Sequence, residues 1–139
     1  MNIRILIGLF FIAHGLVHSG LAVAPIPNDP VSKPFAFFTA PTRSWLLSNM
    51  GMSESVIRNV GLILVALATL TFVMAGLGVL GVPGLYAIWR TVTVVSAIPS
   101  LLLLGVFWHP WLVIGAALDL GILISLLWAH WPPQSMLDS

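Results

Sequence analysis

Four long apolar runs dominate the chain, and most polar residues lie between them. The runs cover residues 5–24, 60–81, 91–108 and 111–129, and only the last contains a formally charged residue, Asp119. Each run is close to the ~20 residues that a helix needs to cross a ~30 Å hydrocarbon core. Because a backbone in lipid must satisfy its own hydrogen bonds, we expect each run to be a helix.

The predicted fold is therefore all-α, an integral membrane four-helix bundle. Its helices are expected near residues 3–24, 55–81, 86–108 and 110–131. The connections after the second and third helices are short, which makes helices two, three and four antiparallel neighbours. We expect one four-helix transmembrane domain over residues 1–139, with both chain ends on the same side of the membrane.

The one long connection, roughly residues 25–53, joins the first two helices. It is Pro-rich in its first half, which forbids regular helix there: Pro25, Pro27, Pro30, Pro34 and Pro41. The stretch PFAFF, residues 34–38, is too apolar for a solvated loop, so we expect it in the interface or over the mouth of the bundle. The segment TRSWLLSNMG, residues 42–51, predicts a short interfacial helix with Trp45 as its anchor and Gly51 as its end.

Composition supports a membrane location and excludes several functions. The chain is 59% hydrophobic and 6% charged, with a mean hydropathy of +1.08, whereas a soluble domain carries about 25% charged residues. We therefore expect a multi-pass protein of the cell membrane, with the lipid bilayer as its partner. A net charge of +1 without a basic cluster argues against nucleic-acid binding. The absence of cysteine excludes disulfides and thiolate metal sites.

Two histidines interrupt the first apolar run, in the stretch FIAHGLVHSG. At 1.5 Å rise per residue, His14, His18 and Asp119 lie roughly 15, 9 and 12 Å in from the side of the long connection. An unpaired Asp at mid-membrane costs about 2.5–3.5 kcal/mol on insertion scales. We therefore expect the three side chains to converge inside the bundle, with a histidine paired to Asp119. Arg4 and His109 are possible additional members of this site, whereas His130 lies at the opposite end.

The candidate site has several interpretations. The two histidines could be neutral structural groups, or they could handle protons or hold the polar head of a ligand. Their spacing, one helical turn apart, also suits a metal site with Asp119 as a third ligand. A single histidine could alternatively hold haem or a chlorophyll-type pigment. Membrane diiron enzymes need several such histidine pairs and this chain has one, so we assign no metal ligands.

The first and last helices resemble the DoxX family of small four-helix membrane proteins. In the first helix the matching residues are an Arg, a Gly, a Phe and a His-Gly pair: Arg4, Gly8, Phe11, His14 and Gly15. In the last helix Gly115, Leu118 and Asp119 match. The family often has Lys at the position of His18, and the long Pro-rich connection departs from its pattern. The resemblance implies a membrane partner of redox systems, in some members linked to thiosulfate oxidation with quinone as acceptor.

Two classes of function follow. In the first, the chain is a DoxX-like, redox-associated protein that holds a quinone or another lipid-like molecule near His14, His18 and Asp119. This hypothesis predicts a cavity bordered by the three residues, with residues 34–38 as its lid. In the second, the chain is a non-catalytic accessory subunit of a larger membrane redox complex. The family's activity is itself poorly defined, so no enzyme activity is carried over.

Overall fold

The computed structural model describes residues 2–25, 36–40 and 43–137, and no strand occurs among them. Its long helices are α1 (Ile3–Val23), α4 (Glu54–Val79), α5 (Trp89–Val106) and α6 (Val113–Leu123). A 3-10 turn (Pro110–Leu112) precedes α6, and a π-helical turn (Ile124–Trp128) continues it. The short helices are α2 (Ala36–Thr39), α3 (Trp45–Asn49) and α7 (Gln134–Leu137).

Within the described residues, four helical spans are long and apolar enough to cross a membrane: Ile3–Val23, Glu54–Val79, Trp89–Val106 and Pro110–Trp128. They confirm the four predicted spans and identify the chain as a membrane protein. The third helix begins three residues later than predicted, because Gly81 and Gly84 adopt left-handed backbone conformations (φ +96° and +83°) in the turn before it. The fourth ends earlier than predicted, before His130, whose φ is +49°.

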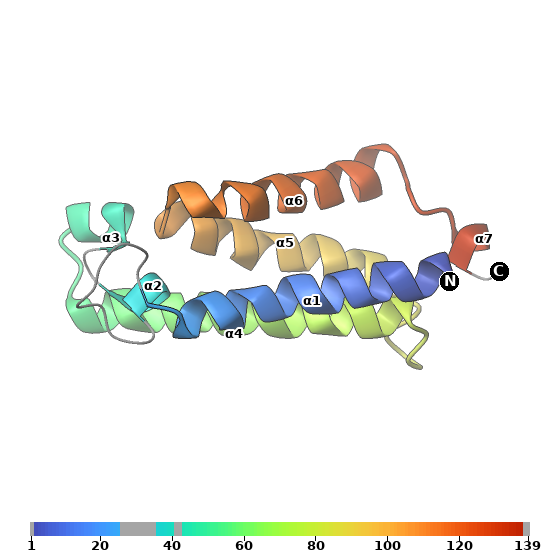
Figure 1. Cartoon of the computed structure of the whole chain (residues 1–139), viewed down its shortest axis with the longest axis horizontal. Coiled ribbons are helices and arrows are strands. Elements are labelled where there is room, and N and C mark those ends of the chain that lie inside the picture. Colours follow the sequence, from blue (N-terminus) through green and yellow to red (C-terminus); the bar gives the residue numbers. More distant parts are fainter. Residues whose placement is uncertain (1, 26–35, 41–42, 138–139) are drawn as a thin grey trace.

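The long helices lie side by side in the order α1, α4, α5, α6 (Figure 1). By contrast, α1 and α6 make little direct backbone contact. Helix α7 packs against the start of α1, so these two segments lie at the same end of the molecule (Figure 1). We refer to this end as the terminal end and to the end that holds α2 and α3 as the long-connection end.

Close approach of α1 to α4 depends on Gly15. A Cβ atom at this position would lie 2.9 Å from both the Phe72 Cβ and the Thr69 carbonyl oxygen. The same contact is reinforced by a hydrogen bond between the Ser19 and Thr69 hydroxyls, at 2.9 Å. Small residues of this kind allow membrane helices to pack backbone against backbone. Gly15 therefore sets how closely the histidine-bearing helix approaches its neighbour.

The long-connection end is closed by aromatic packing. In α2, Phe37 and Phe38 are both fully buried, and the Phe38 ring lies edge-on to Phe107 at 6.1 Å. Gly61 makes this possible, because a Cβ atom there would lie 1.7 Å from the Phe38 carbonyl oxygen.

The short helix predicted within residues 42–51 is present as α3. The Ser44 hydroxyl caps it by accepting from the Leu47 N–H at 3.2 Å. The Trp45 indole donates to the Gly105 carbonyl at 2.8 Å, and Gly51, with φ +70°, follows the helix.

Candidate functional site

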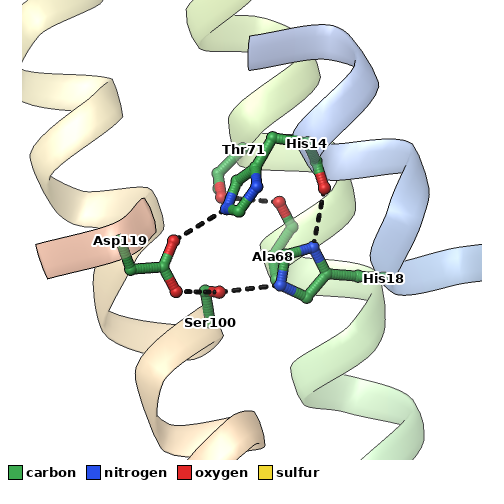
Figure 2. A network of polar contacts seen from close by, with 6 residues as sticks. All are labelled: His14, His18, Ala68, Thr71, Ser100 and Asp119. Atoms are coloured by element: carbon green, nitrogen blue, oxygen red, sulfur yellow. Dashed lines mark hydrogen bonds and ion pairs between the residues drawn. The ribbon is translucent and has the colours of Figure 1, made fainter. Parts of the chain in front are cut away.

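Asp119 is fully buried and pairs with His14 across the molecule. Its Oδ1 atom lies 2.8 Å from the His14 Nε2 atom, and His14 is itself 7% exposed. The pair joins α6 to α1, two helices that otherwise contact each other little (Figure 2). A histidine partner removes much of the cost of a carboxylate in lipid, which is the physical reason for expecting this contact.

The second carboxylate oxygen continues into a chain of hydrogen bonds. Asp119 Oδ2 lies 2.5 Å from the Ser100 hydroxyl, and this hydroxyl lies 2.7 Å from the His18 Nε2 atom. The other nitrogen of His18, Nδ1, lies 3.0 Å from the His14 carbonyl oxygen on its own helix. Figure 2 shows these hydrogen bonds, which join α1, α5 and α6. We call the four residues that form them the polar network: His14, His18, Ser100 and Asp119.

Aromatic side chains enclose the polar network. The Phe72 ring on α4 meets the His14 ring edge-on at 4.7 Å and stacks on the His18 ring at 6.2 Å. Phe10, one turn before His14 on α1, stacks on the His14 ring at 5.9 Å. With Ser100 and Asp119 both 0% exposed, the network lies in surroundings of low polarity, where its hydrogen bonds are stronger than in water.

Sequence reasoning missed Ser100, although this residue links His18 to Asp119. The available signal was weak: Ser96 and Ser100 lie one turn apart on an apolar helix, on either side of Pro99. The structure separates their roles, because the Ser96 hydroxyl donates to the Val92 carbonyl of its own helix at 2.6 Å. Which of two buried serines faces the carboxylate depends on the rotation of α5 against α6.

Arg4 and His109 do not join the polar network. Arg4 donates from Nε to the Val79 carbonyl at 2.7 Å and lies over the Tyr86 ring, at the terminal end. His109 lies in the turn between α5 and the last span, where its Nδ1 atom accepts from the Trp111 N–H at 3.2 Å. Burial and the nearby Arg43 guanidinium lower the pKa of His109. Arg4 therefore joins the start of α1 to the end of α4, and His109 caps the turn before the last span, so neither residue extends the site.

A groove of about 510 Å³ runs between α1 and α6. Its lining is apolar except for one serine: Leu6, Ile7, Phe10, Phe11, Ala117, Leu118, Gly121, Ile122, Ser125, Leu126, Trp131 and Pro132. None of the polar network's residues belongs to this lining, but Phe10 stacks on His14 and Leu118 precedes Asp119 in the chain. The groove therefore lies beside the network, towards the terminal end.

The prediction that residues 34–38 form a lid over the ligand cavity is wrong for Phe37 and Phe38, which the structure describes. Phe37 and Phe38 fill the long-connection end and are absent from the groove lining. The reason is the glycine at position 61, which lets α2 pack directly onto α4 instead of crossing to the groove. Pro34 and Phe35 lie outside the described residues.

The arrangement favours a hydrogen-bond network over a metal centre. The possible ligand atoms of His14, His18 and Asp119 do lie within 4.8 Å of one another. However, hydrogen bonds already engage the Nε2 atoms of both histidines and both carboxylate oxygens. A cation would have to displace at least one of these bonds, because both ring nitrogens of His18 are engaged.

Comparison of this chain with protein-family models, curated proteins and solved structures finds no match.

Proposed function

We propose that this chain is a DoxX-like, redox-associated four-helix bundle of the cell membrane, and that it holds a quinone or similar lipid-like molecule in the groove between α1 and α6. The observation that carries the proposal is the apolar groove beside a buried polar network. Ligand sites combine an apolar lining with a few placed polar groups, and typically measure ~300–1,000 Å³. At about 510 Å³, the groove falls within that range.

The groove suits a ligand that arrives from the bilayer. Its floor is formed by buried side chains, Ile7, Phe11, Ile122 and Leu126. Its rim is formed by Leu6, Phe10 and Leu118, which are 41%, 40% and 39% exposed. An isoprenoid or acyl chain could lie on this floor while its outer side remains in contact with lipid. The Ser125 hydroxyl and the neighbouring network then provide the polar groups available to a head group.

The decisive experiment fills the groove with a side chain. A Cβ atom at Gly121, which lines the groove, would meet nothing within 4 Å, so Gly121→Phe adds volume without an initial clash. Gly20 on α1 is equally open but does not line the groove, which makes Gly20→Phe the matched control. The probe is a short-chain ubiquinone analogue added to the protein in lipid nanodiscs. Binding is followed by quenching of tryptophan fluorescence, because Trp131 lines the groove.

We expect the quenching to saturate. Gly121→Phe should raise the Kd of the quinone at least about tenfold, or ~1.4 kcal/mol, and Gly20→Phe should leave the Kd unchanged. Mass spectrometry of lipids extracted with the protein separates a quinone from a phospholipid as the natural occupant. Quenching that does not saturate, together with no lipid species depleted in Gly121→Phe, would reject the ligand hypothesis.

A second candidate function is that of a non-catalytic accessory subunit. In the last span, Pro110–Trp128, 22% of an 18-residue apolar stretch is buried inside the molecule, compared with 39–44% of such a stretch in each of the other three spans. Its outer face carries large exposed apolar side chains, among them Ile114, Ile124 and Trp128. This face could pack against another membrane protein. Cross-linking from a photoreactive residue at Ile114 in native membranes tests it, since a discrete cross-linked protein is expected for a subunit and only lipid adducts otherwise.

A further inference from the structure

The polar network contains as many hydrogen bonds as it has protons to supply when it is electrically neutral. Four bonds join His14, His18, Ser100 and Asp119, including the one to the His14 carbonyl. With all four side chains neutral, each ring carries one proton, the hydroxyl carries one and the carboxyl carries one. Every proton must therefore occupy one bond, and this condition restricts where each proton lies.

Two of the four protons have fixed positions. A carbonyl oxygen only accepts, so the His18 Nδ1–H must donate to the His14 carbonyl. The His14 ring proton must lie on Nε2, where it donates to Asp119 Oδ1. If that proton were on Nδ1 instead, a neutral network would have three protons for four bonds.

We propose that the two remaining protons are shared along Asp119, Ser100 and His18, and that Ser100 transfers a proton between the two titratable groups. In one arrangement the Asp119 carboxyl donates to the Ser100 oxygen, and the Ser100 hydroxyl donates to His18 Nε2. In the other, the His18 Nε2–H donates to the Ser100 oxygen, and the Ser100 hydroxyl donates to the Asp119 carboxylate. Both arrangements satisfy all four bonds and have no net charge.

The transfer is balanced in atoms and charge. The O–H bond at Asp119 Oδ2 breaks as its proton moves to the Ser100 oxygen, and the original hydroxyl proton moves to His18 Nε2. Ser100 keeps one proton throughout, while Asp119 becomes a carboxylate and His18 an imidazolium. Distances of 2.5 Å and 2.7 Å at the two ends of the hydroxyl are those of strong, charge-assisted hydrogen bonds.

Burial makes neutrality the governing condition. Asp119 and Ser100 are 0% exposed and His18 is 3% exposed, so a net charge on the network would be costly in these surroundings. The helix that packs behind the histidines, α4, faces them with the apolar ring of Phe72. Within the described part of the chain, the titratable groups of the network are therefore His14, His18 and Asp119. The sharing of protons within the network does not depend on what the groove holds.

The test reads the ring protons of the two histidines directly. The protein is labelled with ¹⁵N-histidine in liposomes, with His109 and His130 replaced by Gln so that only the two network rings remain. Nitrogen chemical shifts then distinguish protonated from bare ring nitrogens. We expect His14 to carry its proton on Nε2. We expect His18 to carry a full proton on Nδ1 and a partial, exchanging proton on Nε2.

Three variants complete the experiment. Ser100→Ala and Asp119→Asn should each abolish the Nε2 proton of His18, the first by breaking the link and the second by removing the donor. Ser96→Ala is the matched control, since its hydroxyl bonds within its own helix, and it should leave both rings unchanged. Asp119→Asn keeps the side-chain shape, so it gives the same readout if Ser100→Ala does not fold. A His18 that has no Nε2 proton in the native protein, or that keeps it in both variants, would overturn the proposal.

Discussion

Asp119 is the residue on which the candidate site depends, because it is the one formally charged group in the four apolar runs. Each of its oxygens has a hydrogen-bond partner, His14 on one side and Ser100 on the other. Removing one member of such a buried pair leaves a polar group without compensation, which costs more than the pair itself contributes. The hydrogen bonds to both oxygens together, rather than either one alone, compensate the cost of burying a carboxyl group at this depth.

The first prediction concerns this pair. His14→Ala should destabilise the protein by about 3–5 kcal/mol, because it opens a cavity beside the Phe72 ring and leaves the buried Asp119 Oδ1 without its hydrogen-bond donor. Combining His14→Ala with Asp119→Asn should recover part of that loss, since the amide carries no charge. Unfolding in mixed micelles measures both effects. His109→Ala removes only a turn cap outside the polar network, so it should cost less, about 0.5–2 kcal/mol. Strictly additive losses in the double variant would contradict the pairing of His14 with Asp119.

At the scale of elements, α1 is held against α4 by Gly15 and by the hydrogen bond between Ser19 and Thr69. Both contacts lie within one turn of His14 or His18. The rotation and depth of α1, and hence the direction of its two imidazole rings, depend on this backbone contact. Packing of small residues is thus part of the site, although it contributes no polar atom.

The second prediction follows from that contact. Gly15→Ala should destabilise the protein by about 1–3 kcal/mol, because its Cβ would lie 2.9 Å from Phe72 and from the Thr69 carbonyl. It should also disturb the histidine signals in the NMR experiment, since α1 must shift. Gly20→Ala is the control, as a Cβ atom there meets nothing within 4 Å. Equal stability of the two variants would mean that the helices are not held at this point.

At the scale of the whole molecule, four apolar helices place the chain in a bilayer, and α1 begins at the same end as α7 (Figure 1). The groove is lined by residues of the terminal half of the molecule, whereas α2 and α3 lie at the other end (Figure 1). A ligand in the groove and the segment that covers the long-connection end would therefore be separated by the polar network.

The third prediction tests this topology in a membrane. The chain has no cysteine, so single introduced cysteines report their own location. Asn2→Cys and Gln134→Cys should be labelled by an impermeant maleimide from one side of the membrane, and Ser53→Cys from the other. Labelling of Asn2→Cys and Gln134→Cys from opposite sides would exclude four spans.

The four spans could be predicted from hydropathy because the cost of placing a peptide in lipid depends on each segment by itself. The contact between Asp119 and a histidine could also be anticipated, since a buried carboxyl requires a partner at the same depth and rise per residue fixes that depth. The site residues His14, His18 and Asp119 followed from this argument. Their chemical role is not decided by depth, and it stays a proposal.

What only the tertiary structure decided depends on how the helices rotate and approach one another. Ser100 completes the network because α5 turns that hydroxyl, and not the one at Ser96, towards Asp119. The groove opens between α1 and α6 because the backbones of these two helices make little direct contact. Helix α2 fills the opposite end because Gly61 has no side chain and lets the α2 backbone approach closely. Such contacts join residues far apart in the chain. Hydropathy cannot predict them, because the hydropathy of an apolar helix does not depend on how the helix is rotated against its neighbours.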